Sequence, residues 1–280
     1  MVVPSSPTGT GAPTPGLRGG ATAGDSVPAL DDRGARSHSL LSVAAHKAVR
    51  QRMLLLRQAA LDRIVALTGV SVPELQRLRH ELRGSDLPDL LIQRGAGVAI
   101  TGELPQGALL YLIVRATRPR LVVETGVRPG YSTAWILAAL EANGSGALTS
   151  LGPGPTAGRS LGVRDYRLGQ LVPPSLRSRW TLALGNTPDR LRELLETARP
   201  VDVFFSDNGP DSALNRLELR TAWKALSPSG ILLAHHIDAN PAWRDFCALQ
   251  GLPAQTLDPG PPPLGALTVR AADRPAPARA

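Results

Sequence analysis

The chain has 280 residues, which suits one sizeable domain with appendages or two small domains, and 42% hydrophobic residues allow a substantial core. The net charge of +8 comes from arginines scattered along the chain without a block of like charge, a pattern that favours solvated faces over a surface for nucleic acid or another acidic partner. One cysteine, Cys247, excludes an intramolecular disulfide, and neither a spanning apolar stretch nor a signal-peptide pattern occurs, so we expect a cytoplasmic protein without a membrane partner.

Composition divides the chain into four parts. Residues 1–37 are rich in Gly, Pro, Ser and Thr with few large apolar side chains, so we expect a disordered tail that cannot bury enough surface to order itself. A helical N-terminal extension is predicted for 38–100 and an α/β domain for 101–271. The last residues, 272–280, are expected to form a second disordered tail.

The extension has apolar residues near a period of 3.6 from Ser39 to about Leu82, which predicts helices. Gly69 is a plausible stop, and Ser71 with Glu74 three residues later has the pattern of a capping box that starts a new helix. These helices are expected to pack on the main domain or on a second subunit. The sequence therefore leaves open whether the protein forms a homodimer through the N-terminal helices.

After Thr101 helical and strand patterns alternate, which predicts an α/β fold with a mostly parallel sheet and helices on both of its faces. Runs such as "RLVVE", "PVDVFFSD" and "GILLAHH" are continuously apolar, as strands buried on both faces should be. The stretch "GPPPLGALTV" predicts a turn into the last strand, which is expected to be antiparallel. The predicted strands are 120–124, 147–151, 180–184, 201–206, 230–235 and 265–270, and the predicted helices are 105–117, 131–142, 188–198, 212–226 and 240–250.

The stretch "LVVETGVRPGYSTAWILAAL" joins a strand, a glycine loop and a helix. Gly126 and Gly130 let the backbone approach a ligand closely, and the following helix points its positive N-terminus at the same place. The spacing G-x-x-x-G lacks the third glycine of a dinucleotide fingerprint and the G-K-[ST] ending of a P-loop. Glu124, at the carboxyl edge of the strand, would repel a pyrophosphate but attract an ammonium group or accept from a hydroxyl; it could also cap a turn or pair with Arg128.

Several motifs together resemble the class I methyltransferases that use S-adenosylmethionine, and most closely the bacterial O-methyltransferase-like group known as methyltransferase family 24. The resemblance covers about Ser39 to Arg270 and rests on "VVETGVRPGYSTAWILAAL", "LVPPSLRSRWTLALGNTPDRLRELL", "PVDVFFSDNGPDS", "AWKALSPSGILLAHHI" and "NPAWRDFC". It implies a Rossmann-like fold with a seven-stranded sheet and S-adenosyl-L-methionine as cofactor.

The same resemblance implies a role for each matching residue. The cofactor's amino-acid end would meet the glycine loop, its ribose the end of the second strand and its adenine the segment "GNTPD", while the end of the fourth strand would face the methyl group and the substrate. The resemblance places Glu124, Thr125, Gly126, Gly130 and Ser132 at the amino-acid end of the cofactor. It places Gly152 at the ribose and Asn186 at the adenine, and Asp207 would face the methyl group and the substrate.

Two departures from the family pattern stand out. Gly152 occupies the place of an acid that normally binds the ribose hydroxyls, and no acid follows until Asp165. Backbone carbonyls of the loop could take over, or Asp165 could reach back. An adenine dinucleotide phosphate, with Arg159 at its extra phosphate, is an alternative that Glu124 and the missing glycine oppose.

The second departure is the pair His235 and His236 at the end of the fifth strand, where relatives more often have acids. One hypothesis is a general base that removes a hydroxyl proton during methyl transfer. Another is a divalent metal site with Asp207, one histidine and Asp238, although no metal is favoured. Because adjacent strand residues point to opposite faces, only one histidine is expected to aim at the pocket, and the simplest alternative places one in the core and one at the surface.

The sequence thus predicts a methyltransferase that acts on a hydroxyl of a small or sugar-like acceptor, with Asp207, His235 and His236 as catalytic candidates. The rival interpretation is a degenerate methyltransferase fold retained as a binding or scaffolding subunit. The intact "VETGVRPG" loop favours the enzyme. Gly152 favours the rival, as does the "SDNGPD" loop, which keeps Asp207 but lacks the histidine that the resembled family usually has a few residues later.

Overall fold

A computed structural model describes residues 42–95, 104–152, 168–185, 188–197 and 200–269. The two tails predicted at 1–37 and 272–280 lie outside these ranges, as do Arg159, Asp165 and Asn186. Among the described residues no helix is long and apolar enough to cross a membrane.

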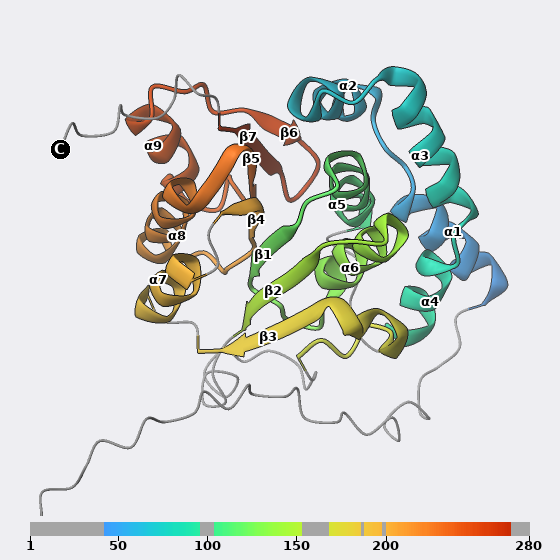
Figure 1. Cartoon of the computed structure of the whole chain (residues 1–280). Helices are drawn as coiled ribbons and strands as arrows, with labels where there is room; N and C mark the ends of the chain where they lie inside the picture. Colours follow the sequence, from blue (N-terminus) through green and yellow to red (C-terminus); the bar gives the residue numbers. More distant parts are fainter. Residues whose placement is uncertain (1–41, 96–103, 153–167, 186–187, 198–199, 270–280) are drawn as a thin grey trace, which may run out of the picture.

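A seven-stranded sheet forms the centre of the molecule, in the order β3-β2-β1-β4-β5-β7-β6 (Figure 1). Neighbouring strands are parallel except at β7, which is antiparallel to both β5 and β6. The predicted mostly parallel, seven-stranded sheet is therefore confirmed. The strands are β1 Leu121–Thr125, β2 Ala147–Gly152, β3 Trp180–Leu184, β4 Val201–Ser206, β5 Leu226–His235, β6 Thr256–Asp258 and β7 Leu264–Thr268.

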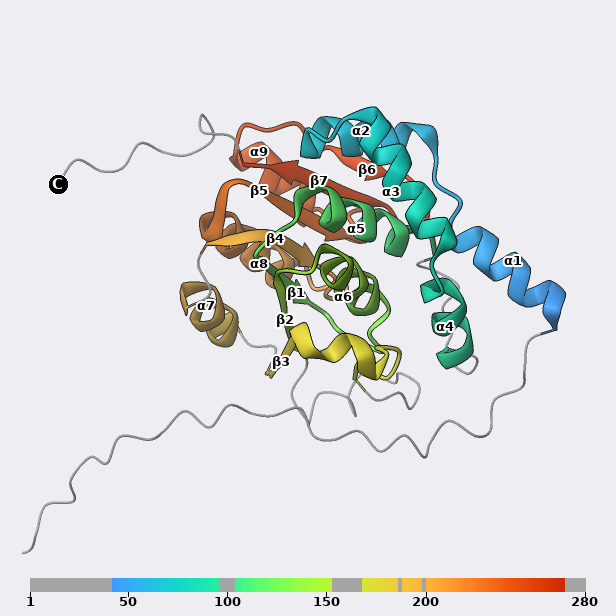
Figure 2. The ribbon, with the colours of Figure 1, turned by 45° about the vertical axis from the view of Figure 1, so that its right-hand side comes forward.

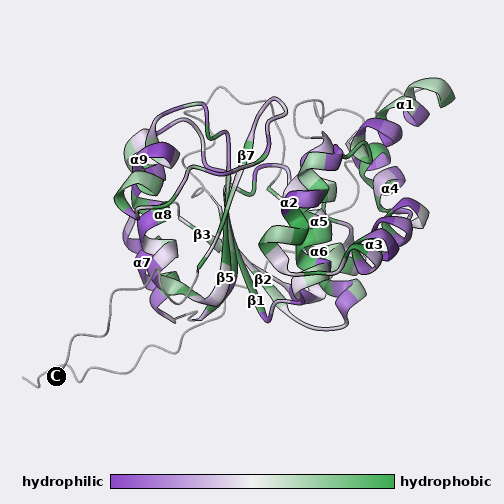
Figure 3. Ribbon diagram, turned by 90° about the horizontal axis from the view of Figure 1, so that it is seen from above, coloured by the Kyte–Doolittle hydropathy of each residue, from purple (hydrophilic) through white to green (hydrophobic). Residues whose placement is uncertain are grey.

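Helices cover both faces of the sheet, as the alternating pattern predicts. Viewed from above, α7, α8 and α9 lie on one side, and α5 and α6 lie on the other (Figure 3). A hydrophobic core lies on each face of the sheet, and adjacent residues of a strand pack into opposite cores. Val122 packs toward α5 and α6, whereas Val123 packs toward α7, α8 and α9. These helices are α5 Leu104–Thr117, α6 Tyr131–Asn143, α7 Pro188–Thr197, α8 Ser212–Ala225 and α9 Ala242–Leu249, and a short 3-10 helix, η3, spans Pro174–Arg179.

The element bounds agree with the sequence patterns to within a few residues, with two differences. β5 begins at Leu226, four residues before the predicted start of this strand. β6 was not predicted at all, because three residues are too few to show a recognisable alternation.

The described part of the N-terminal extension, residues 42–95, contains four helices, α1 Val43–Met53, α2 Gln58–Thr68, α3 Val72–Gly84 and α4 Leu87–Arg94. Gly69 ends α2 in the left-handed conformation with φ +71°, and the Ser71 hydroxyl accepts from the backbone N–H of Glu74 at 3.3 Å, so the predicted stop and cap both form. Figure 2 shows α1 to α4 along one side of the molecule, with α1 and α4 farthest from the sheet.

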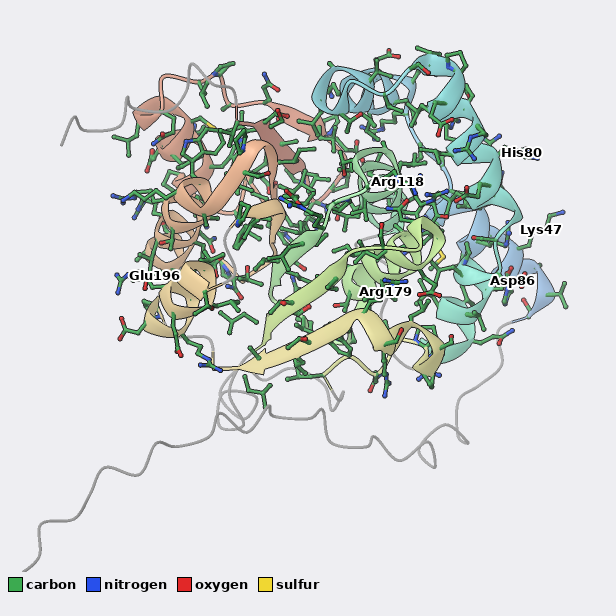
Figure 4. All side chains as sticks on the ribbon, viewed as in Figure 1. Lys47, His80, Asp86, Arg118, Arg179 and Glu196 are labelled. Atoms are coloured by element: carbon green, nitrogen blue, oxygen red, sulfur yellow. The ribbon has the colours of Figure 1, made fainter. Side chains whose placement is uncertain are left out.

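The extension packs on its own α/β domain. α2 lies against α5, β6 and β7, and the Thr268 hydroxyl of β7 donates to the carbonyl of Leu67 in α2 at 3.0 Å. α3 is fixed to α5 by Arg115, whose Nη2 lies 2.7 Å from Glu81 Oε2. Lys47 and His80 of the extension point away from the sheet (Figure 4). The exposed residues of the extension also include the apolar Val43, Leu55, Val72 and Leu90.

Candidate functional site

The candidate site lies where β1, β2, β4 and β5 end. Two of these ends touch through their backbones: the N–H of Asp207 donates to the carbonyl of Thr125 at 3.1 Å. A Cβ added to Gly126 would lie 2.1 Å from the carbonyl oxygen of Asp207, and the φ of Gly126 is +85°. Only glycine permits this close approach between the loops after β1 and β4.

The glycine loop is also held from the other side. The carbonyls of Arg128 and Pro129 accept from the N–H groups of Gly169 and Leu171, at 3.1 and 2.9 Å. Gly130, the residue before α6, has φ +92°, and an added Cβ would lie 2.9 Å from the Cα of Gly169. The loop therefore has one defined conformation at the N-terminus of α6.

Glu124 is fully buried and is held by three hydroxyl groups. Ser132 donates to its Oε1, while Thr133 and Ser150 donate to its Oε2 at 2.7 and 2.8 Å. Burial raises the pKa of Glu124 to about 7, against the opposing effect of these hydroxyl donors. Glu124 thus joins β1, the first turn of α6 and β2, and Ser132, the other predicted cofactor residue here, is one of its direct partners.

Gly152, the predicted ribose position, ends β2 in apolar surroundings. Its carbonyl accepts from the N–H of Gly185 at 3.0 Å. An added Cβ would make ordinary contacts of 3.4 to 3.8 Å with Leu182, Leu168 and Leu184. A side chain at this position is therefore sterically acceptable, whereas Asn186, the predicted adenine neighbour, lies outside the described residues.

Asp207 stands between an arginine and a histidine. Its Oδ1 lies 2.6 Å from Nη2 of Arg128 and 2.8 Å from Nδ1 of His235. Asp207 is 4% exposed and His235 7%. The glycine loop, β4 and β5 thus each contribute one side chain to this cluster, and Arg128 reaches it from a left-handed backbone with φ +43°.

The sequence predicts that only one of the two histidines aims at the pocket, but both lie beside Asp207. Asp207, His235 and His236 have side-chain ligand atoms within 4.8 Å of one another, and the two imidazole rings are 4.1 Å apart between centroids. β5 ends at His235, and His236 has φ +53°, so the alternation of a strand no longer applies at that residue. His235 is buried and His236 half-buried.

The contacts of His235 define its tautomer. The carboxylate of Asp207 can only accept, so Nδ1 carries the proton and Nε2 of the neutral ring is an acceptor. Nε2 is buried without a hydrogen-bond partner among the described residues. Burial, followed by the neighbouring His235, lowers the pKa of His236. The lowered pKa favours the neutral form of the His236 imidazole, which can accept a proton.

The same cluster is a poor match to a magnesium site. Two imidazoles and one carboxylate suit zinc or iron rather than the oxygen ligands that Mg²⁺ prefers. Asp207 Oδ1 already accepts from Arg128 and His235, so a cation there would have to displace the guanidinium. Asp238, the acid proposed from the sequence as a ligand, is exposed and does not belong to the group.

Sequence reasoning missed Glu218, a second buried acid in α8. Its carboxylate accepts from Ser206 at 2.8 Å, from Thr125 at 3.3 Å and from the side-chain amide of Asn208. Burial raises its pKa to about 7. The burial of Glu218 could have been predicted from its helical spacing to Ala222 and Ala225, which places it on the buried stripe of the helix.

The sheet order, the glycine loop at the end of β1 and the cluster at the ends of β4 and β5 define a class I methyltransferase fold, the class that uses S-adenosylmethionine. Residues 123–237 match the model of methyltransferase family 24, described as a methyltransferase domain. Residues 123–237, which include the glycine loop and the cluster at the ends of β4 and β5, are thus similar to the methyltransferase domain of that family.

Solved structures with a similar fold include three bacterial proteins. An O-methyltransferase from Bacillus cereus in complex with SAH is 22% identical (TM-score 0.49), and the match covers 74% of this chain and all of that one. The O-methyltransferase TomG from Streptomyces achromogenes, in complex with SAM, is 18% identical (TM-score 0.48; 79% and 94% covered). A methyltransferase from Geobacter sulfurreducens is 21% identical (TM-score 0.43; 69% and 98% covered). No curated protein matches the sequence.

Proposed function

We propose that the protein transfers the methyl group of S-adenosylmethionine to a hydroxyl oxygen of a small molecule such as a sugar, with His235 as the general base. The observation that supports this most is the buried Asp207–His235 pair, whose free Nε2 is an acceptor at the carboxyl edge of the sheet. The edge formed by strand ends is where open α/β sheets bind their ligands.

The cofactor is proposed to lie over the ends of β1 and β2. Gly126 and Gly130 would allow its amino-acid end close to the backbone, and Thr125 and Ser132 border the same loop. Glu124 would act through its hydroxyl partners, by fixing the N-terminus of α6 beside the cofactor. The ribose would lie by Gly152 and the adenine by Asn186.

The bound cofactor supplies an activated methyl group on a sulfonium. That methyl group would pass to the acceptor oxygen, and the electron pair of the broken carbon–sulfur bond would stay on sulfur. The hydroxyl proton passes to Nε2 of His235, and the resulting imidazolium is stabilised by Asp207. Arg128 holds Asp207 in position, and alignment of the oxygen with the methyl carbon supplies much of the rate.

Cofactor binding can be tested by calorimetric titration with S-adenosylhomocysteine. We expect micromolar binding to the wild-type protein and its loss in Gly130→Ala, since a Cβ at residue 130 would displace the segment at Gly169. Gly144→Ala is the matched control, because Gly144 also has positive φ, at the other end of α6, but has no atom within 4 Å of an added Cβ. Gly144→Ala should bind as the wild type does.

The rival function makes the opposite prediction. A folded wild-type protein that does not bind S-adenosylhomocysteine at millimolar concentration would contradict the methyltransferase proposal. That result would support a binding or scaffolding role for the fold.

A further inference from the structure

Beside the Asp207–His235 pair, a small pocket opens between the ends of β4 and β5 and the helices α8 and α9. Ser206 and Ala234 border it from the strands, Asn215 from α8 and Trp243 from α9, and both histidines of the cluster complete its wall. The pocket therefore lies next to the proposed reaction site but on the α8 and α9 side of the sheet.

Three residues of this wall carry a buried polar atom that has no hydrogen-bond partner in the described part of the chain: Asn215 Oδ1, His235 Nε2 and Trp243 Nε1. Trp243 is 3% exposed, so water outside the protein does not reach its indole N–H. Buried polar atoms in native proteins are normally paired, and several unpaired ones around one pocket indicate a missing partner.

The chemistry of each atom follows from its neighbours. The side-chain amide of Asn215 donates through Nδ2 to the carbonyl of Gly209 at 3.2 Å, which leaves Oδ1 as an acceptor. The indole N–H of Trp243 can only donate. The pocket therefore offers a donor and an acceptor in addition to the proposed base, His235.

Trp243 is fixed in place and cannot turn to find a partner. A Cβ added to Gly265 would lie 2.6 Å from Cε2 of its indole, so the ring fills the space that a larger residue in β7 would occupy. The start of α9 is held by Asn240, whose Oδ1 accepts from the N–H of Ala242 at 2.9 Å and whose Nδ2 donates to the carbonyl of Pro210 at 3.2 Å. The wall is thus preorganised.

We propose that this pocket binds a second, neutral hydroxyl group of the methyl acceptor, with Trp243 donating to its oxygen and Asn215 accepting its proton. This inference rests on the proposed function for the identity of the ligand. A carboxylate could not donate to Asn215, and an ammonium group could not accept from Trp243, so only a group that donates and accepts satisfies both. The acceptor therefore carries, besides the hydroxyl that is methylated, a second neutral group that both donates and accepts, and a hydroxyl is the smallest such group.

The experiment is a ¹H–¹⁵N NMR titration of the indole N–H signals of the full chain, which has four tryptophans. The probes are methanol and ethane-1,2-diol, with acetate and methylammonium as charged probes of similar size. Trp243→Phe assigns the Trp243 signal. Trp135 is the internal control, because its Nε1 is also buried without a partner, but it lies in α6 on the other face of the sheet.

We expect the hydroxyl probes to shift the Trp243 signal saturably, with a dissociation constant on the order of tens of millimolar for such small ligands, and to leave Trp135 unchanged. Asn215→Ala should weaken this shift several-fold. The absence of a saturable Trp243 shift with either alcohol, an equal shift of Trp135, or a shift by acetate or methylammonium alone would each overturn the proposal.

The titration separates this inference from the proposed function, because it requires no turnover. Binding of S-adenosylhomocysteine is measured on the same sample. If the protein binds S-adenosylhomocysteine but the Trp243 signal does not shift, the proposed function is supported and the hydroxyl subsite is overturned. If the Trp243 signal shifts but S-adenosylhomocysteine does not bind, the hydroxyl-binding pocket is supported and the methyltransferase proposal is contradicted.

Discussion

Gly152 stands where the resembled family normally has an acid, and its surroundings show what a side chain would contact there. An added Cβ would make only ordinary van der Waals contacts, and Gly152 is not among the glycines with positive φ. Its conformation therefore does not require glycine. The missing acid is a difference in ligand chemistry rather than a consequence of the backbone.

Gly152→Asp is accordingly expected to strengthen binding of S-adenosylhomocysteine. A carboxylate that accepts from the ribose hydroxyls contributes about 1.5–3 kcal/mol, or roughly tenfold to a hundredfold in affinity. Calorimetric titration measures the change, with Gly152→Asn as the uncharged isostere that should gain less. Unchanged or weaker binding in Gly152→Asp would place the ribose elsewhere.

His235→Gln tests the general base. Loss of proton transfer should lower kcat by about a hundredfold or more while the affinity for S-adenosylhomocysteine stays within twofold. His236→Gln is the matched control, because the His236 ring lies beside that of His235 but makes no hydrogen bond to Asp207 in the described part of the chain. Steady-state kinetics with a competent acceptor would contradict this assignment if His236→Gln lost kcat and His235→Gln did not.

Two buried carboxylates connect the elements around the site. Glu124 joins β1 to α6 and β2, and Glu218 in α8 joins the ends of β1 and β4 from the opposite face of the sheet. Thr125 and Ser206, the two hydroxyl partners of Glu218, directly precede Gly126 and Asp207. The arrangement of the loops after β1 and β4 therefore depends on both acids.

These acids make stability depend on pH. Burial raises the pKa of Glu218 from an ordinary 4.5 to about 7, so the unfolded chain releases this proton at lower pH than the folded chain. The free energy of unfolding should therefore be highest below about pH 4.5 and fall as the pH rises to about 7. The lowered pKa of His236 acts in the opposite direction below about pH 6.5, so the wild type must be compared with a variant.

Glu218→Gln should reduce this fall by up to about 1.4 kcal/mol per pH unit, since that is the effect of one proton. Urea unfolding at pH 4.5, 6 and 7.5 measures it, with the exposed Glu193→Gln as control. If the free energy of unfolding falls with pH as steeply in Glu218→Gln as in the wild type, Glu218 is ionised throughout this pH range.

In the whole molecule, the N-terminal helices and the sheet share one core. Leu78 of α3 is 1% exposed and belongs to the same cluster of buried side chains as Val203 and Leu233 in the sheet. Arg115 adds a charged contact between α5 and α3, and its hydrogen bond lowers the pKa of Glu81. The extension is therefore expected to unfold together with the α/β domain.

Leu78→Ala tests this cooperativity. The cavity should cost about 2–5 kcal/mol and shift a single transition, whereas the exposed Leu55→Ala should change stability by less than about 0.5 kcal/mol. All four tryptophans lie in the α/β domain, so their fluorescence reports a distant effect of the substitution. Fluorescence that unfolds separately from far-UV circular dichroism would show that the extension is independent.

Local signals in the sequence were enough for most of the fold. Continuous apolar runs predicted β1, β4 and β5, because strands buried on both faces need no polar side. Ser71 and Gly69 predicted a helix start and a helix end from capping chemistry alone. The short β6 escaped prediction, since its conformation depends on pairing with β7 rather than on its own residues.

For the site, the sequence by itself indicated the class of protein and the glycine loop, and it singled out Glu124, Asp207 and the two histidines as candidates. Only the tertiary structure decided how they pair: Arg128 and His235 converge on Asp207, His236 turns toward them, and Glu218 and Trp243 join the site from helices far along the chain. The physical reason is that helix caps and apolar periodicity depend on residues a few positions apart. Hydrogen bonds between loops depend on backbone angles and on the packing of separate elements, which no local pattern records.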